Sequence, residues 1–512
     1  MKRKGALNVL LVVASLVLCT AIAEAVVDYL DYSDDLGPAV RHLDTIALAP
    51  GVQRAWFFEA PPPLPNRRPV PEAWNELVHR VEASGITEGT RRADMFKAWN
   101  AKFVGDPCRN DYLCGAPGHL FVYDPPDGEP HPPFRFMPDA TSPVGLVTNQ
   151  YGFRGPPVPF ARAPRTVRIA FIGASTTVGS HFQPYSYPEF VGFWLNLWAA
   201  ARKLDLKFEV LNAGRESINS GDNVVILRDE VLPLRPDLVV YYEGANQFDL
   251  QTLVPEPLGY IPHHVLYEGE ACPAQPVDPT NAPQQGLLER IARNSALGRR
   301  VLALMSARAR PGGGGEVPRE RRPTTVFPKS VDERDPAIAT APARAELPVN
   351  LGTILDDLDS IRRDAEQLGA QLVLASFIWL VKDGMVLDPI RHRSILDYLS
   401  QGYGRFSYRD MERLAAFQNR VFAKYARLND LAFIDVARLM PFDPDLYIDA
   451  IHNSYAGERL RAWVFLQGLV PLVEAHLKSG AWPRALPPTV APAPSFKPRE
   501  ITFDCRPPRP RP

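Results

Sequence analysis

The feature of this 512-residue chain that most restricts its fold is an alternation of short apolar runs with amphipathic segments from about residue 165 onwards. The apolar runs are 167–172, 208–211, 237–242, 371–377 and 431–436, and the segments with helical periodicity are 188–204, 221–232, 350–368, 409–428 and 454–477. Such alternation is typical of a parallel sheet with helices on both faces. The sequence therefore predicts an α/β fold, a three-layer αβα sandwich with a five-stranded parallel sheet of flavodoxin-like winding. Ser220 is expected to cap the helix 221–232, which Pro233 ends.

Composition and charge exclude several classes of protein. Apolar residues make up 46% of the chain and charged residues 22%, which excludes both wholesale disorder and a protein with many membrane spans. The chain has 57 Lys and Arg residues against 58 Asp and Glu residues, so no overall charge attracts nucleic acid or anionic lipid. Proline is frequent, at 53 residues, about twice the usual share of about 5%. These prolines predict long loops and extended connections.

The N-terminus resembles an export signal. Lys2, Arg3 and Lys4 precede an apolar run from Gly5 to about Val27. Positive residues stay on the cytoplasmic side, and about 20 apolar residues are enough to span a bilayer. The triplets 21–23 and 23–25 also fit a small-x-small cleavage site. Residues 1–27 are thus expected to be a signal-anchor that spans the membrane or, alternatively, a cleaved signal peptide, and the chain after about residue 28 is expected outside the cytoplasmic membrane.

The remaining sequence divides into three further parts, the second of which contains an insertion. Residues 28–128 form an N-terminal extension of unknown role, and residues 129–480 form the α/β domain. An insertion at about 250–345, rich in Gly, Pro and Arg, is expected to be flexible, and its glycines lack the Lys-Ser/Thr of a phosphate loop. Residues 481–512 are a proline-rich tail.

Besides Cys19, the chain has four cysteines, at positions 108, 114, 272 and 505. An even number in an oxidising compartment is compatible with two disulfides in any of three connectivities, and also with free thiols. Cys108 and Cys114 would close a small loop, which leaves Cys272 for Cys505. No Cys-x-x-Cys pair supports a zinc site, and the pair His263-His264 has no carboxylate at metal spacing, so a surface loop is the preferred interpretation.

Candidate catalytic residues follow four of the predicted strands, at the sheet edge where ligands of such folds bind. Ser175 follows the first strand, Gly214 the second and Asn246 the third, while Asp449 and His452 lie beyond the fifth. A serine nucleophile needs a base, which His452 can provide, and Asp449 can hold the other ring nitrogen. The N–H groups of Ser175 and Gly214 and the amide of Asn246 could stabilise the oxyanion formed in acyl transfer.

Each of these residues also has an ordinary structural explanation. Ser175 could be only a helix cap, Asp449 and Asn246 turn residues, and His452 a packing histidine. Gly214 could serve only a tight turn. Their joint order and their positions at strand ends favour the catalytic interpretation.

This set of residues resembles the SGNH hydrolases, the GDSL-type esterases and lipases. The resemblance covers about 130–475 without the insertion, and it rests on four blocks: Ser175, Gly214, Gly244 with Asn246, and Asp449 with His452. The stretch 149–155, Asn-Gln-Tyr-Gly-Phe-Arg-Gly, is similar to a lead-in of many bacterial members. The chain departs from the family at Ala174, at Arg215-Glu216-Ser217, at Gln247 and at Asn453, and none of these changes removes a catalytic atom.

The resemblance implies a serine esterase with a triad of Ser175, His452 and Asp449 and an oxyanion hole of Ser175, Gly214 and Asn246. It implies no metal and no organic cofactor. Together with the export signal, it suggests an acyl ester on a small molecule, a glycan or a lipid as the substrate. Two alternatives remain: an O-acyltransferase with the same triad acting on a cell-envelope polysaccharide, and a non-catalytic binding or assembly protein. The sequence names no protein partner.

Overall fold

The computed structural model describes residues 36–62, 146–179, 183–215, 218–246, 352–382 and 408–484, with a few shorter or isolated stretches elsewhere. The predictions for the insertion, for His263-His264 and for the four cysteines beyond Cys19 lie outside the described residues. Cys19 is a free, exposed thiol.

The central element is a five-stranded, fully parallel sheet with the order β3-β2-β4-β5-β6. Its strands are β2 (Thr166–Ile172), β3 (Lys207–Asn212), β4 (Leu238–Tyr241), β5 (Gln371–Ala375) and β6 (Ala432–Ile434). The chain first adds β3 on one side of β2 and then continues on the other side. This flavodoxin-like order creates a switch point at the carboxyl ends of β2 and its neighbours. The predicted fold class is confirmed.

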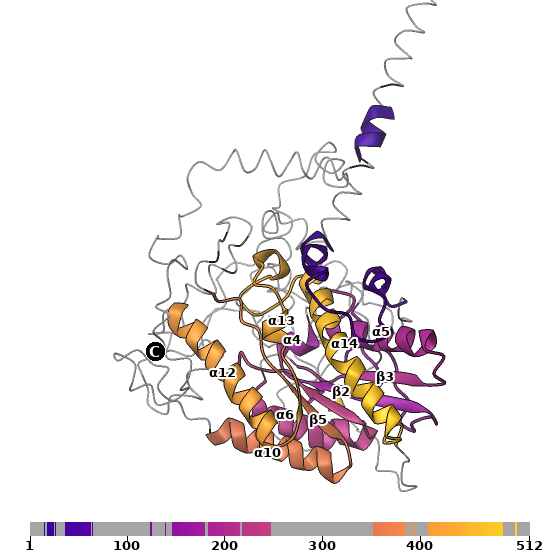
Figure 1. The fold of residues 1–512 in the computed structure, drawn as a ribbon, viewed down its shortest axis with the longest axis vertical. Coiled ribbons are helices and arrows are strands. Elements are labelled where there is room, and N and C mark those ends of the chain that lie inside the picture. Colours follow the sequence, from indigo (N-terminus) through magenta and orange to yellow (C-terminus); the bar gives the residue numbers. More distant parts are fainter. Residues whose placement is uncertain are drawn as a thin grey trace, which may run out of the picture.

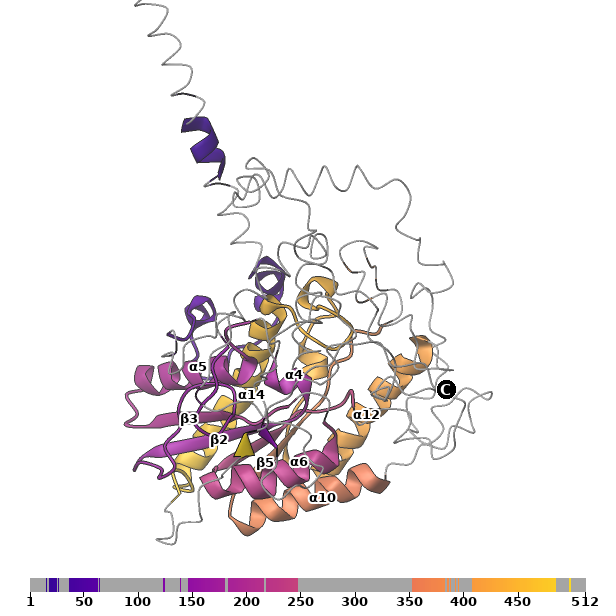
Figure 2. The same ribbon diagram turned by 180° about the vertical axis from the view of Figure 1, so that it is seen from behind.

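Helices cover both faces of the sheet (Figures 1 and 2). The helix α5 (Tyr187–Ala201) packs against α14 (Tyr455–Lys478), and α6 (Ser220–Ile226) packs against α10 (Gly352–Gln367). The long helix α12 (Tyr408–Leu428) lies along β5 and β6, where the Tyr425 hydroxyl donates to Asp359 of α10. The shorter elements are η1 (Arg54–Phe58), α4 (Ser175–Val178), η3 (Leu227–Val231), η4 (Leu232–Leu234), α13 (Val436–Leu439) and η8 (Pro444–Leu446), with a separate antiparallel pair of β1 (Tyr123–Asp124) and β7 (Lys497–Pro498).

The start of α6 corrects one prediction. Asn219, rather than Ser220, is the capping residue. Its backbone is extended, so its side-chain oxygen can accept from the Asp222 N–H at 3.1 Å, while Asp222 accepts from the Asn219 N–H at 2.9 Å. This reciprocal pair is a capping box. Pro233 also does not end the helix as predicted: α6 ends at Ile226, and the chain continues as the π-helix η3 and then as the 3₁₀-helix η4, which contains Pro233.

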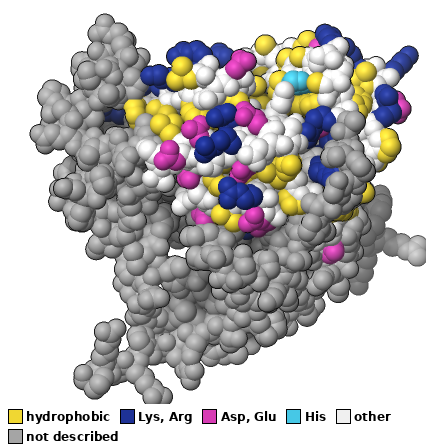
Figure 3. Space-filling view, turned by 90° about the horizontal axis from the view of Figure 1, so that it is seen from below, with side chains coloured by type: hydrophobic (Ala, Val, Ile, Leu, Met, Phe, Trp, Pro, Cys, Tyr) yellow, Lys and Arg dark blue, Asp and Glu magenta, His cyan; other side chains and the backbone are white. Residues whose placement is uncertain are grey.

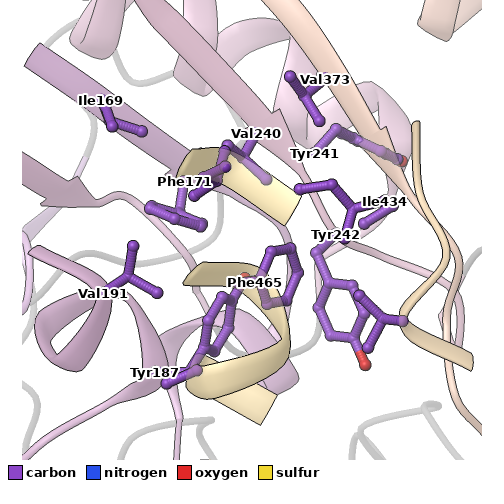
Figure 4. Packing of buried hydrophobic residues seen from close by; sticks show 14 of the residues in the cluster. Ile169, Phe171, Tyr187, Val191, Val240, Tyr241, Tyr242, Val373, Ile434 and Phe465 are labelled. Carbon is purple, nitrogen blue, oxygen red and sulfur yellow. The ribbon is translucent and has the colours of Figure 1, made fainter. Parts of the chain in front are cut away.

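Aromatic side chains fill the layer between the sheet and the pair α5–α14 (Figure 4). Tyr187 of α5 stacks on Phe465 of α14 with ring centroids 4.8 Å apart, and Phe171 of β2 meets both rings edge-on. All three side chains are fully buried. This packing fixes the carboxyl end of β2, and the turn that follows it, against both helices.

The opposite end of the sheet holds a buried ion pair. Arg168 of β2 lies directly across from Glu209 of β3, and their side chains are 2.7 Å apart. Both side chains are almost inaccessible to solvent. A buried charge of this kind requires its partner, because a lone charge in the interior is very unfavourable.

Part of the N-terminal extension belongs to the same hydrophobic core. Residues 36–43 are helical, and Leu43, Trp56 and Phe57 are buried against the domain. The Phe57 ring stacks on Trp194 of α5, and its carbonyl accepts from Arg459 of α14 at 2.6 Å. The segment 36–59 is therefore a structural part of the domain.

The described surface shows mixed charge. In the view of Figure 3, basic and acidic side chains are interspersed with hydrophobic ones, as the net charge of −1 suggests. Within the described parts of the chain, no helix is long and apolar enough to cross a membrane.

Candidate active site

Ser175 lies at the junction between β2 and the short helix α4. Gly173 has φ +154°, and a Cβ there would lie 2.1 Å from the Tyr242 carbonyl oxygen, so only glycine fits this tight turn. Ser175 is the first residue of α4 and is 7% exposed. Its hydroxyl therefore lies at the carboxyl edge of the sheet. Its N–H is in the first turn of α4, where the N–H groups have no acceptor within the helix.

His452 comes from the loop between η8 and α14. The Ile448 N–H donates to the His452 carbonyl at 2.8 Å, and Tyr447 forms a β-bridge with Asn453. Within this loop Asp449 accepts from the Ile451 and His452 N–H groups at 2.9 and 2.8 Å. The loop is thereby closed into a compact turn that presents the imidazole towards α4.

The three predicted triad residues are in hydrogen-bonding contact. His452 Nε2 lies 2.8 Å from Ser175 Oγ, across 277 positions in sequence. His452 Nδ1 lies 2.8 Å from Asp449 Oδ2. An ionised carboxylate can only accept, so Nδ1 carries the proton and Nε2 is left to accept from the serine hydroxyl. The chain Asp449–His452–Ser175 is thus arranged for proton transfer from the serine.

The electrostatics of this chain favour an ionised Asp449. Burial by itself would raise the pKa of this carboxyl, but the nearby His452 charge and the hydrogen bonds from His452 and Ile451 hold its pKa below the usual range. An ionised Asp449 at neutral pH fixes the tautomer of His452 and stabilises the imidazolium that proton transfer creates.

The side-chain amide of Asn246, which the sequence predicts as an oxyanion donor, makes one hydrogen bond within the protein. Its Nδ2 donates to the Ile218 carbonyl at 2.9 Å, and its own N–H donates to Glu243 Oε1 at 3.0 Å. An amide nitrogen has two hydrogens, so the contact with Ile218 orients the side chain and leaves a second donor.

The prediction for Gly214 needs a correction. Its N–H donates to the Asn212 side-chain oxygen at 3.1 Å, so in this structure the group is not directed at an oxyanion. A Cβ at Gly214 would lie 2.5 Å from the Val178 nitrogen. The glycine is required because this turn passes directly against α4, and its role is close packing behind the nucleophile.

Three side chains that the sequence did not single out hold the carbonyls at the end of α4. Arg461 donates to the Thr176 carbonyl at 2.7 Å, Asn212 to Thr177 at 2.9 Å and Arg154 to Val178 at 2.9 Å. The last carbonyls of a helix have no intrahelical donor. Arg154 belongs to the lead-in 149–155, whose resemblance to a family motif was the only signal in the sequence for this support.

Within the part of the chain that the structure describes, no cluster of three or more His, Cys, Asp or Glu residues could hold a metal ion.

Comparison with known proteins gives fold likenesses only. No protein-family model matches the sequence, and no curated protein matches it. Among solved structures, the lipase/acylhydrolase from Enterococcus faecalis is similar, with 14% identity, a TM-score of 0.30 and coverage of 59% of this chain and 95% of that chain. The acetylxylan esterase Axe2 from Geobacillus stearothermophilus has 16% identity, a TM-score of 0.30 and coverage of 59% and 94%. A GDSL-like lipase from Bacteroides thetaiotaomicron has 13% identity, a TM-score of 0.26 and coverage of 61% and 88%.

Proposed function

We propose that this protein is a serine ester hydrolase of the SGNH type. The observation that carries the proposal is the unbroken pair of 2.8 Å contacts from Asp449 through His452 to Ser175. A serine with a hydrogen-bonded imidazole, itself oriented by a carboxylate, is the general arrangement of an activated nucleophile. In this proposal the N–H of Ser175 and the second hydrogen of the Asn246 amide would stabilise the oxyanion.

The reaction follows from these contacts in two steps. Ser175 Oγ attacks the ester carbonyl carbon while its proton moves to His452 Nε2, and the carbonyl oxygen becomes negative. The bond to the alcohol oxygen then breaks, and Nε2 returns the proton to the departing alcohol. In the second step a water molecule attacks the acyl-enzyme with its proton passing to Nε2, the bond to Oγ breaks, and Oγ takes up the proton as the acid leaves.

A fluorophosphonate probe tests the proposal without knowledge of the substrate. We expect the full chain, purified in mild detergent, to be labelled on Ser175, as mapped by mass spectrometry, and Ser175→Ala to remain unlabelled. Release of free acid from p-nitrophenyl acetate measures hydrolysis, and acyl transfer to an added oligosaccharide would instead indicate an O-acyltransferase. An unlabelled Ser175 in folded protein would contradict a catalytic function and favour a binding or assembly protein.

We further propose that the catalytic domain lies outside the cytoplasmic membrane and acts on an acyl ester of an envelope glycan or lipid. The support is the basic residues 2–4 followed by the apolar run 5–27. Alkaline phosphatase, which is active only outside the cytoplasm, is expected to be active when fused to the C-terminus of the full chain. The same fusion without residues 1–27 should be inactive. Equal activity of the two fusions would refute the proposed location.

A further inference from the structure

The carboxyl group of Glu243 lies between the two turns that carry the proposed nucleophile and the proposed oxyanion amide. Glu243 follows β4 by two residues and is completely buried. Its Oε2 accepts from the Ala174 N–H at 2.9 Å, directly before Ser175. Its Oε1 accepts from the Asn246 N–H at 3.0 Å, and the Gly244 N–H also donates to the carboxyl. One side chain therefore connects both turns.

The backbone of Glu243 is itself firmly held. Its carbonyl accepts from Gln418 Nε2 of α12 at 3.1 Å. The next residue, Gly244, leaves no room for a side chain, since a Cβ there would lie 2.3 Å from Gln418 and from Phe377. The backbone that carries the carboxyl is thus fixed between the sheet and α12.

Glu243 has no arginine or lysine partner among the described residues. Burial raises its pKa to about 7, while the three backbone N–H groups and, more weakly, the charge of His452 oppose that rise. The interaction with His452 is reciprocal, so an ionised Glu243 favours the imidazolium that forms when Ser175 gives up its proton. No ion pair within the described parts of the chain explains the burial of this carboxyl, and its hydrogen bonds are with the turns that carry Ser175 and Asn246.

We propose that Glu243 is a positioning residue for acyl transfer, which holds the Ser175 turn and the Asn246 turn at a fixed separation. This inference rests on the proposed function. Both oxygens of the Glu243 carboxylate can accept hydrogen bonds from backbone N–H groups. A glutamine at this position can accept with its oxygen only, because its NH₂ group is a donor and would face a backbone N–H, which is also a donor. Misplacement of catalytic groups by about 1 Å can lower a rate by about 100-fold.

The test compares two buried glutamates in the full-length chain. Glu243→Gln is expected to lower both the fluorophosphonate labelling rate of Ser175 and kcat for p-nitrophenyl acetate by about 10- to 100-fold. KM should change by less than about threefold, since positioning acts mainly in the transition state. Glu209→Gln is the matched control: it removes a buried carboxylate at the far end of β3 and should leave both rates of the folded protein unchanged. Glu243→Asp, which keeps two acceptor oxygens but shortens the reach, should recover part of the lost rate.

Circular dichroism and thermal melting establish the folded fraction for each variant. Wild-type rates in folded Glu243→Gln would overturn the inference. So would equal losses of rate in Glu243→Gln and Glu209→Gln, because these would reflect stability alone. If Glu243→Gln does not fold, Glu243→Asp decides: a normal labelling rate there overturns the inference, and a reduced kcat with unchanged KM supports it. Failure of wild-type protein to label on Ser175 refutes the proposed function instead, so the two failures are distinguishable.

Discussion

Replacement of His452 by alanine is expected to lower kcat for p-nitrophenyl acetate by about 10⁴- to 10⁶-fold. His452 Nε2, at 2.8 Å, is the group placed to take the Ser175 proton. Without it the attack would require a neutral hydroxyl, which is a poor nucleophile. Asp449→Asn should lower kcat by about 10⁴-fold or less, because an amide at this position favours the wrong tautomer of the ring. The measurement is initial rate under saturating substrate, together with the rate of fluorophosphonate labelling.

A second His–Asp pair near this loop provides a matched control. His42 Nε2 lies 2.8 Å from Asp443, and its side chain is 27% exposed. The pair has the same nitrogen–oxygen distance as His452 and Asp449, but it uses Nε2 instead of Nδ1, and its imidazole belongs to the N-terminal segment. His42→Ala is therefore expected to keep kcat within about twofold, because its ring contacts Asp443 at η8 and lies outside the Asp449–His452–Ser175 chain of contacts. Similar losses for His42→Ala and His452→Ala would argue that the loop conformation, and not the imidazole of His452, limits the rate.

The general plan of the site could be predicted because it depends on where strands end. Parallel strands bring their carboxyl ends to one edge, so Ser175 after β2 and Asn246 after β4 were expected to approach each other. The spacing of Asp449 and His452 also limits their possible geometry to one turn. Each of these inferences uses only local sequence and the order of the elements.

The supporting residues could not be predicted, because their roles depend on partners distant in sequence. Glu243 is distinguished from other buried acids only by the turns whose N–H groups donate to its oxygens. Arg461 lies 285 positions from the Thr176 carbonyl that it contacts. Gly214 was identified from the sequence, but its residue type is compatible with two roles. A glycine after a strand is compatible with an oxyanion donor or with close packing, and only the hydrogen bond to Asn212 decides between them.

For a similar reason the sequence does not show the role of segment 36–59, which falls within the extension 28–128 of unknown role. Its buried residues, among them Trp56 and Phe57, do not show the periodicity of a long helix or strand. Their partners are α5 and α14, more than 100 residues later. Through Arg41, which contacts Asp443 and Asp445, the segment also reaches η8, directly before the loop that carries His452. The segment that follows the proposed membrane anchor is thus linked by ion pairs to the element that precedes the catalytic loop.

Arg461→Met is expected to produce the largest loss of stability, about 3–5 kcal/mol in the free energy of unfolding. The guanidinium is 1% exposed and forms an ion pair with Glu458, whose side chain is equally buried. It also lies over the rings of Tyr187 and Tyr242, at 4.5 and 5.2 Å from their centroids. Methionine keeps most of the volume but leaves the Glu458 carboxylate buried without a cation. Urea unfolding, followed by tryptophan fluorescence, measures the loss.

An exposed pair with the same sequence spacing is the control. Arg438 and Asp435 are also three residues apart on a helix end, at 3.2 Å, but their side chains are 71% and 39% exposed. Arg438→Met should change stability by less than about 1 kcal/mol, because water screens the pair. The double variant Arg461→Met with Glu458→Leu should be more stable than Arg461→Met alone, since it removes the unpaired carboxylate. If the double variant were less stable, the loss would come from the contacts of Arg461 with Thr176 and the aromatic rings, and α4 would depend on the guanidinium itself.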